Sequence, residues 1–295
     1  MLRLDGVYPP IPTPFSADGE LALPELQANL AWWTGTGLAG VVVLGSNGEY
    51  VALSEPEKLE AIRVTRAAVP AKQSVIAGTG AESTRETIRL SCAAAALGVD
   101  AVLVVTPHYY RARMDAASLL AHYVAVADAT PVPILLYNVP ANTGIDMSPD
   151  IVLQLAEHPN ILGIKDSSGN MPAMAEVLRA KPSEFAVFAG SAGFMLPALA
   201  LGAAGAIVAQ ANVAPCETVR LYTAWQQGDV AAARALQLRL LPVNAAITAR
   251  WGVPALKAAL DRLGRYGGPP RLPLLPLPAA HNAQLADLLM AAGLL

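Results

Sequence analysis

The chain has 295 residues, of which 54% are hydrophobic and only 15% are charged, and its formal net charge is -3 at pH 7. A closed α/β barrel typically takes about 250 residues in one domain, so this length and apolar content suit one large barrel core. The slightly negative charge and the lack of any Lys/Arg cluster in the sequence argue against a nucleic-acid partner.

Neither export nor a membrane span is expected from the sequence. The N-terminus has no apolar secretory segment. Residues 185–216 carry no charge, but glycines, prolines and the polar Gln210 and Asn212 interrupt them. A membrane helix needs about 20 nearly unbroken apolar residues, so this stretch is expected to be core. Cys92 and Cys216 are only two and far apart, which fits a reducing cytoplasm.

Short apolar segments alternate with helical patterns along the first two thirds of the chain. Their residues are mostly aliphatic or β-branched at successive positions, which suits parallel strands covered on both faces. The expected strands are 7–12, 40–44, 74–77, 101–105, 133–137, 161–165, 185–189 and 205–209. Eight strands in this alternation predict an α/β fold, the (β/α)8 TIM barrel.

Start and stop signals place several of the helices between these strands. Ser54 with Glu57, and Ser83 with Glu86, match the capping-box pattern in which a side chain at each position satisfies a backbone N–H of the other. Gly98 is expected to end the second of these helices, just before the strand that begins at residue 101.

The last part of the chain changes to helices alone. They are expected at about 215–227, 230–249, 253–263 and 279–292, with a proline-rich connector at 267–278. No glycine-serine linker separates this part from the rest. We therefore expect residues 1–211 to form the barrel and residues 212–295 to form a helical extension packed on it.

Polar groups end three of the expected strands, and the carboxyl ends of barrel strands form one rim. Lys165 ends the sixth strand, Tyr137 ends the fifth, and Gly-Ser-Asn-Gly-Glu at 45–49 follows the second. Burial disfavours an ammonium group, so a lysine that closes an apolar strand tends to become a nucleophilic amine. An amine, a phenol and a hydroxyl/amide turn predict imine chemistry on a keto acid. The alternatives are a solvated lysine at a strand end and a tyrosine of the core.

Further residues near the rim extend the expected site. The glycines on either side of Ser46 and Asn47 are expected to leave backbone N–H groups free to hold a carboxylate, although the segment also suits a plain turn. Tyr109 follows the fourth strand and is expected to act in catalysis, with an interface role as the alternative. The four histidines and two cysteines show no metal-ligand spacing, so neither a metal nor a cofactor is expected.

Three motifs resemble those of the dihydrodipicolinate synthase and N-acetylneuraminate lyase superfamily, and the resemblance covers essentially the whole chain. They are Gly-Ser-Asn-Gly-Glu at 45–49, Tyr-Asn-Val-Pro at 137–140 with Thr143-Gly144, and Gly-Ile-Lys-Asp at 163–166. The resemblance implies a class I aldolase that forms a Schiff base with pyruvate-derived 2-keto acids on a (β/α)8 barrel, usually as a homotetramer.

The resemblance also implies a role for each matching residue. Lys165 matches the imine-forming lysine, and Tyr137 matches the phenol that shuttles protons at the substrate. Tyr109 matches a tyrosine that reaches into the site of a neighbouring subunit. Ser46 and Asn47 match the positions that bind the α-carboxylate of the substrate.

Four more residues are expected to line the pocket or to set its substrate specificity. Gly190 and Ile207 match pocket-lining positions of the family, and Ser167 is a candidate substrate-binding residue beside the lysine. Asn142 stands where dihydrodipicolinate synthases usually carry an arginine that binds the carboxylate of the aldehyde substrate. Asparagine has neither the charge nor the fork of a guanidinium, which argues against aspartate semialdehyde as the substrate.

The longer motifs resemble the 4-hydroxy-2-oxoglutarate aldolases, so the expected reaction is cleavage of that compound to pyruvate and glyoxylate. These motifs are Pro-His-Tyr-Tyr-Arg at 107–111, Val-Pro-Ala-Asn-Thr-Gly at 139–144, Ala-Gly-Ser-Ala-Gly-Phe at 189–194 and Tyr-Gly-Gly-Pro at 266–269. By chain position alone, Arg111 and Arg113 are candidates for binding the distal carboxylate, with surface salt bridges as the alternative.

Other functions remain open at this point. The enzyme alternatives are 4-hydroxy-tetrahydrodipicolinate synthase, which joins pyruvate to aspartate semialdehyde, a sugar-acid aldolase or N-acetylneuraminate lyase-like enzyme, and a keto-acid dehydratase. A keto-acid-binding regulator without catalysis is the alternative from another class, because the fold alone permits it.

Overall fold

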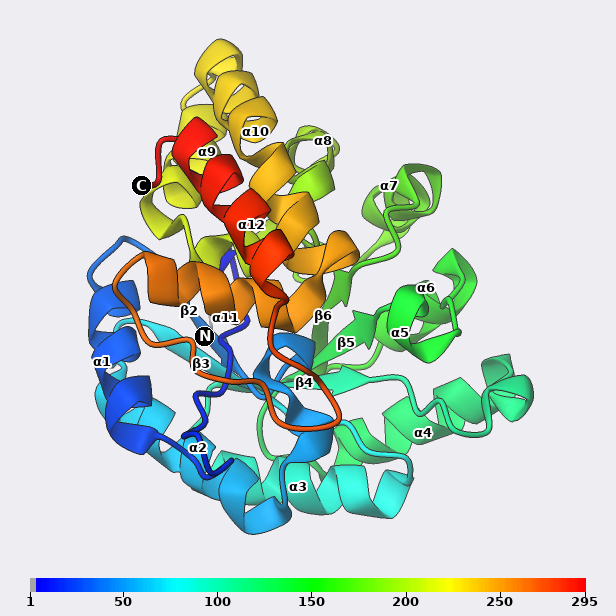
Figure 1. Ribbon diagram of the computed structural model, residues 1–295. Coiled ribbons are helices and arrows are strands. Elements are labelled where there is room, and N and C mark those ends of the chain that lie inside the picture. Colours follow the sequence, from blue (N-terminus) through cyan, green and yellow to red (C-terminus); the bar gives the residue numbers. More distant parts are fainter. Residues whose placement is uncertain (1–3) are drawn as a thin grey trace.

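Eight parallel strands form one sheet in the order β1-β8-β7-β6-β5-β4-β3-β2 in the computed structural model, which describes residues 4–295. A bridge between Pro10 and Val42 joins the segment after β1 to β2 and closes the sheet into a barrel. Helices surround the strands in Figure 1. The predicted (β/α)8 barrel is therefore confirmed.

The strands lie close to their predicted places. They are β1 (Gly6–Tyr8), β2 (Gly40–Val43), β3 (Ser74–Gly78), β4 (Ala101–Val105), β5 (Ile134–Asn138), β6 (Ile161–Asp166), β7 (Ala186–Ala189) and β8 (Gly205–Ile207). The first is shorter than the predicted 7–12, because Pro9, Pro10 and Pro12 have no N–H to donate to a ladder. The last also ends early, at Ile207, and residues Ala209–Asn212 form a 3-10 turn.

Helices of the barrel alternate with the strands. They are α1 (Leu23–Thr34), α2 (Glu55–Ala68), α3 (Thr84–Ala96), α4 (Ala116–Ala129), α5 (Pro140–Thr143), α6 (Pro149–Ala156), α7 (Met171–Ala180) and α8 (Met195–Ala200). The capping box of Ser54 and Glu57 is present. Only half of the second box forms, because the Glu86 carboxylate binds Arg89 instead of the backbone N–H of Ser83. Gly98 follows the end of α3 with φ of +83°, as its role as a stop signal requires.

Four helices after residue 212 pack on the barrel, and Figure 1 shows them from yellow to red on one side of it. They are α9 (Pro215–Gln226), α10 (Val230–Ala245), α11 (Gly252–Arg262) and α12 (Ala279–Ala291). The predicted helix 230–249 leaves α geometry after Ala245. Residues Ala246–Arg250 form a wider π turn instead, in which the N–H of Trp251 donates to the carbonyl of Ala246.

Side chains on successive strand residues belong to two separate cores. In β2, Val41 and Val43 pack between the strands and the helices, whereas Val42 belongs to the cluster inside the barrel. Tyr137 belongs to the inner cluster as well. Residues on alternate positions point to opposite faces of a strand, and this alternation decides which polar residues face the barrel axis.

The uncharged stretch 185–216 lies mainly in these cores, as expected. Phe188 and Ile207 are fully buried in the inner cluster, and Met195 and Leu199 pack in the outer one. Among residues 4–295, we find no helix with both the length and the apolar character that crossing a bilayer requires.

Candidate active site

Lys165 and Tyr137 are neighbours on the inner wall of the barrel. They are register partners on β6 and β5, at the carboxyl ends of both strands. Lys165 is only 3% exposed and Tyr137 only 5%. The Lys165 Nζ lies 4.2 Å from the centroid of the Tyr137 ring. The fold therefore brings together the amine and the phenol that the sequence places at two strand ends.

Hydrogen bonds around the Tyr137 hydroxyl tune its acidity. It lies 3.3 Å from the Ser46 hydroxyl and also bonds to Lys165 and Ser167. Burial alone raises the pKa of Tyr137. The nearby Lys165 charge and these hydrogen bonds outweigh burial and hold the pKa below the ordinary tyrosine value of about 10. A phenol with a lowered pKa is a better proton carrier near neutral pH.

The turn after β2 forms a 3-10 helix over Ser46–Gly48. The expectation that the glycines leave their N–H groups free is wrong for Gly48, whose N–H donates to the carbonyl of Gly45 at 2.9 Å. The first N–H groups of a helix have no partner within it. The donors that this turn can offer a carboxylate therefore belong to Ser46 and Asn47.

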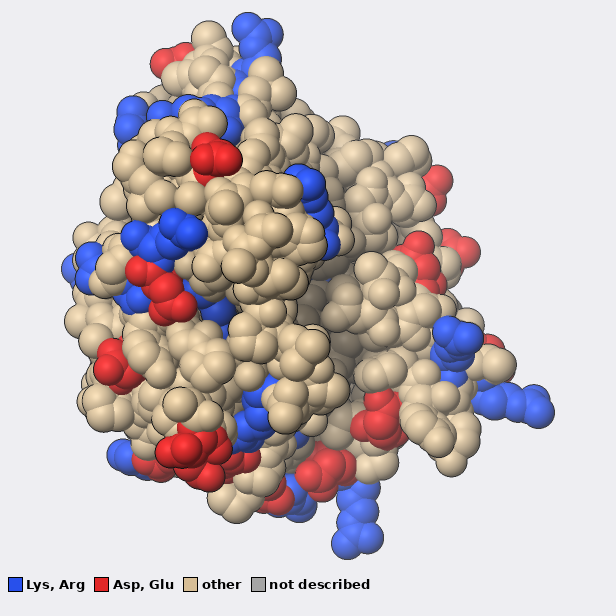
Figure 2. All heavy atoms as spheres, in the orientation of Figure 1, with Lys and Arg blue, Asp and Glu red and all other residues tan. Residues whose placement is uncertain are grey.

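A cavity of about 230 Å³ opens at this end of the barrel. Its wall includes Ser46, Tyr50, Val51, Val105, His108, Val139, Asn142 and Thr143. A smaller pocket beside it shares Ser46 and reaches Tyr137. Figure 2 shows a hollow between the C-terminal helices and the segment of α5 and α6, with acidic and basic side chains scattered over the face around it. The larger cavity thus lies next to the pocket that Tyr137 lines.

Asn142 lies on the rim, where α5 carries it into the wall of the larger cavity. Gly144 ends this helix in the left-handed region, with φ of +68°. A Cβ built on Gly144 would lie 3.2 Å from the Nη1 of Arg111. The structure therefore places the guanidinium of Arg111 beside the end of α5, the helix that carries Asn142.

Ser167 and Gly190 meet at the ends of β6 and β7. The N–H of Gly190 donates to the carbonyl of Asp166 at 2.7 Å. A Cβ on Gly190 would lie only 2.0 Å from the Ser167 hydroxyl oxygen, so a side chain at this position would displace a group that bonds to Tyr137. Ile207 is fully buried in the same inner cluster as Tyr137.

Tyr109 stands apart from this group. Its side chain is 76% exposed, and its ring packs edge-on against Tyr110 with centroids 5.0 Å apart. The Glu82 carboxylate fixes its backbone by accepting its N–H at 2.8 Å. Within residues 4–295, no hydrogen bond or ring contact joins Tyr109 to Tyr137. Its predicted role in catalysis therefore stays a prediction.

Comparison with known proteins identifies the family. A model of the dihydrodipicolinate synthetase family matches residues 3–292. The chain belongs to this family. Dihydrodipicolinate synthetase family members are Schiff-base lyases and aldolases, so the protein is an enzyme of that class.

Several known proteins are similar to this chain over nearly its whole length. The chain is 40% identical over 288 residues to 4-hydroxy-tetrahydrodipicolinate synthase of Methanosphaerula palustris, and the match covers 97% of this chain and 98% of that one. A dihydrodipicolinate synthase of Bacillus anthracis has a TM-score of 0.95 at 32% identity, covering 98% and 99% of the two chains. YagE of E. coli K12, solved in complex with pyruvate, has a TM-score of 0.94 at 33% identity and full coverage of both chains.

One buried ion pair behind the Ser46 turn is not predicted by the sequence. Glu49, the last residue of the motif at 45–49, is buried and forms an ion pair with Lys257 of α11, with Nζ and Oε1 2.6 Å apart. Both are distant in sequence, so no local pattern joins them. The available signal was Lys257 itself, a charged residue among the apolar positions Ala255, Leu256 and Leu260 that form the buried face of its helix.

Proposed function

We propose that Lys165 forms an imine with the C2 carbonyl of pyruvate or of a longer 2-keto acid, and that the enzyme then makes or breaks the C3–C4 bond. The observation that carries this proposal is the buried amine of Lys165, 4.2 Å from the ring of Tyr137. An iminium at C2 is an electron sink for the C3–C4 bond, whose electrons form the C2–C3 double bond of an enamine as it breaks. The complexes with pyruvate described for YagE and for the Acinetobacter baumannii synthase support the same substrate here.

In the cleavage direction, the amine of Lys165 attacks C2 and water leaves. Tyr137 accepts the proton of the C4 hydroxyl while the C3–C4 electrons move into the iminium, which gives an enamine and releases an aldehyde. Protonation at C3 and hydrolysis then free pyruvate and the amine. Ser46 and Asn47 hold the α-carboxylate and so keep C2 beside the amine, which is a positioning effect.

For the aldehyde, we propose glyoxylate, so that the substrate cleaved is 4-hydroxy-2-oxoglutarate. The supporting observation is Asn142 at the wall of the mouth cavity, where the motif of dihydrodipicolinate synthases has an arginine. An amide gives a carboxylate no charge-assisted, two-pronged contact. Arg111, whose guanidinium lies beside Gly144, is the cation that we propose for the distal carboxylate.

A second candidate is 4-hydroxy-tetrahydrodipicolinate synthase, which condenses pyruvate with aspartate semialdehyde. The names of the relatives favour this reaction more directly than the aldolase reaction, because relatives at 36–40% identity carry the synthase name. The two candidates share the lysine, the tyrosine and pyruvate, and differ in the aldehyde and in the direction of the reaction.

A substrate panel separates these candidates. The purified protein is assayed for pyruvate release from 4-hydroxy-2-oxoglutarate and from N-acetylneuraminate, and for condensation of pyruvate with aspartate semialdehyde. We expect the first to show the highest kcat/KM. A higher kcat/KM for condensation would establish the synthase instead, and binding of pyruvate without any turnover would indicate a regulator.

The Asn142→Arg variant tests whether residue 142 determines which aldehyde the enzyme uses. A guanidinium at this position should raise kcat/KM for aspartate semialdehyde by about 10-fold to 100-fold, the range of a charge-assisted hydrogen bond. The matched control is Ala141→Arg, which adds the same charge at the neighbouring exposed residue. Equal effects of the two substitutions would remove Asn142 from the choice of aldehyde.

The Arg111→Met variant tests the site of the distal carboxylate. The KM for 4-hydroxy-2-oxoglutarate should rise about 10-fold, because a charged contact to substrate is lost. Borohydride trapping with pyruvate should not change, because pyruvate has no second carboxylate. Arg113→Met is the control at the other end of the same 3-10 turn. An unchanged KM in Arg111→Met would leave the distal carboxylate to another group.

We further propose that the enzyme acts as a homo-oligomer, a tetramer by the resemblance stated above. Tyr109 and Tyr110 are 76% and 71% exposed, and Val51 on the wall of the mouth cavity is 74% exposed. Large apolar side chains exposed close together suit a subunit contact. The mass in solution by light scattering tests this proposal, and a monomer at all concentrations would contradict it.

A further inference from the structure

The turn that carries Ser46 ends at a residue with an unusual backbone. Glu49 has φ of +54°, in the left-handed backbone region that residues other than glycine rarely adopt. Its side chain is 3% exposed although it bears a carboxylate. A residue in this state persists only where its surroundings determine it strongly. The groups that bind the Glu49 carboxylate come from a distant part of the chain.

Two residues of the C-terminal part bind the Glu49 carboxylate. The Nζ of Lys257 lies 2.6 Å from Oε1, and both side chains are nearly inaccessible. The backbone N–H of Arg271 donates to Oε2 at 2.8 Å. The ammonium of Lys257 also donates to the carbonyl of Pro269 at 2.9 Å and lies 4.4 Å from the ring centroid of Phe15. The C-terminal segment thus contacts both carboxylate oxygens, Oε1 through an ion pair without a hydrogen bond and Oε2 through a hydrogen bond.

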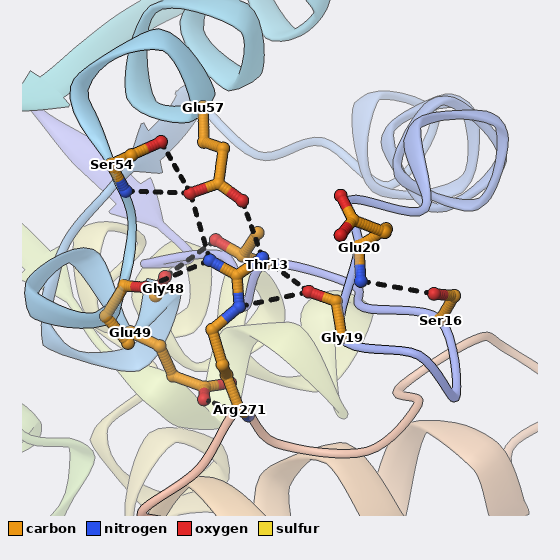
Figure 3. A network of polar contacts seen from close by, with 10 residues as sticks. Thr13, Ser16, Gly19, Glu20, Gly48, Glu49, Ser54, Glu57 and Arg271 are labelled. Carbon is orange, nitrogen blue, oxygen red and sulfur yellow. Dashed lines mark hydrogen bonds and ion pairs between the residues drawn. The ribbon is translucent and has the colours of Figure 1, made fainter.

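The side chain of Arg271 extends this contact along the same loop. Figure 3 shows it reaching Glu57 at the start of α2, with Nη2 and Oε1 2.6 Å apart. It also donates to the carbonyl of Ala52 at 2.9 Å, within the short turn that follows Glu49. On the other side of the turn, the Thr13 hydroxyl donates to the carbonyl of Gly48 at 2.6 Å. The segment from Gly48 to Glu57 is therefore held at several points.

These contacts bear on the catalytic tyrosine through Ser46. Ser46 begins the 3-10 turn that Glu49 ends, and the N–H of Glu49 donates to the Ser46 carbonyl at 3.2 Å. The Ser46 hydroxyl in turn lies 3.3 Å from the hydroxyl of Tyr137. Apolar packing is non-directional and would not fix this distance. Hydrogen bonds have defined geometry, and the buried ion pair anchors the charged end of Glu49.

We propose that Lys257 and Arg271 are positioning residues of the reaction: by holding Glu49, they keep the Ser46 hydroxyl in contact with the hydroxyl of Tyr137. The C-terminal helical part thereby acts on catalysis without contacting the substrate. This inference rests on the proposed function, in which Tyr137 carries the proton of the C4 hydroxyl.

The test is a double-mutant cycle on the dependence of kcat on pH. Ser46→Ala removes the hydrogen bond to Tyr137 directly. The double substitution Glu49→Gln with Lys257→Met removes both buried charges together, so that neither is left unpaired. Each change alone should lower kcat at neutral pH about 10-fold and move the rise of kcat to higher pH, because Tyr137 loses a hydrogen bond that favours its ionised form. Lys165 and Ser167 also act on Tyr137 and are unchanged in both variants.

The variant that carries all three substitutions tests whether Glu49 and Lys257 act through Ser46. If Glu49 and Lys257 act through Ser46, the triple variant should match Ser46→Ala in kcat and in its pH profile, because interacting positions are not additive. Lys181→Met, which removes a half-buried lysine at the end of α7, is the control and should keep wild-type kinetics. Arg271→Lys provides a milder variant, which keeps the backbone contact to Glu49 and should show a smaller shift.

Three results would overturn the inference. They are a Glu49→Gln, Lys257→Met variant that loses only thermal stability, an additive triple variant, and an Arg271→Lys shift equal to that of Ser46→Ala. Failure of the proposed function is recognised separately. In that case the wild-type protein itself shows neither borohydride trapping with pyruvate nor turnover in the substrate panel.

Discussion

Lys165→Ala should abolish turnover and should also abolish borohydride trapping with pyruvate. Without the amine there is no imine, and therefore no electron sink for the bond at C3–C4. We expect a fall in kcat on the order of 10⁵-fold or more, the scale found when a covalent nucleophile is removed from an enzyme. The measurement is mass spectrometry after reduction, which should detect one pyruvyl adduct per chain in the wild type and none in the variant.

The control for this variant is Lys72→Ala, because Lys72 is exposed. It should be trapped and turn over like the wild type. An adduct that persists in Lys165→Ala, mapped by digestion to another lysine, would mean that the imine forms elsewhere. Loss of the buried amine should also raise the pKa of Tyr137, because Lys165 is the main charge that lowers it.

The barrel was predictable from the sequence because each strand carries its own signal. Buried parallel strands are mostly aliphatic, and the segments at 101–105 and 161–164 show this pattern without help from distant residues. The fold then determines the rest of the argument. Once the strands are parallel and in order, their carboxyl ends share one rim, so Lys165 and Tyr137 must be neighbours.

Contacts between side chains from distant segments of the chain could not be predicted from the sequence. The ion pair of Glu49 and Lys257 joins the second strand's loop to a helix near the end of the chain, and neither residue has a local feature that names the other. Glu86 differs, because its partner is the guanidinium of Arg89 on the same helix rather than the predicted backbone N–H, and Arg89 also binds the distant Glu55. Several polar partners compete for one carboxylate, and only tertiary packing decides between them.

Tyr137→Phe should separate the two halves of the reaction. The variant retains Lys165 and should still form the imine with pyruvate, so borohydride trapping remains. Cleavage should slow by about 10²-fold to 10⁴-fold, the usual contribution of a general acid-base group. Rapid mixing with a single turnover of 4-hydroxy-2-oxoglutarate, with parallel reduction of the imine, measures both steps on one sample.

The pH dependence of the cleavage rate tests the role of Tyr137 more directly than the loss of rate does. The pKa of Tyr137 lies below the ordinary tyrosine value, so wild-type cleavage should rise with pH and level off at that lowered pKa. Tyr137→Phe should lose this rise. Tyr123→Phe is the matched control, because it removes a fully buried hydroxyl that donates to the Val104 carbonyl at 3.1 Å in the outer core. It should lower stability and keep the rise of kcat with pH. A Tyr137→Phe variant with the same pH profile as the wild type would assign the proton transfer to another group, whatever the loss in rate.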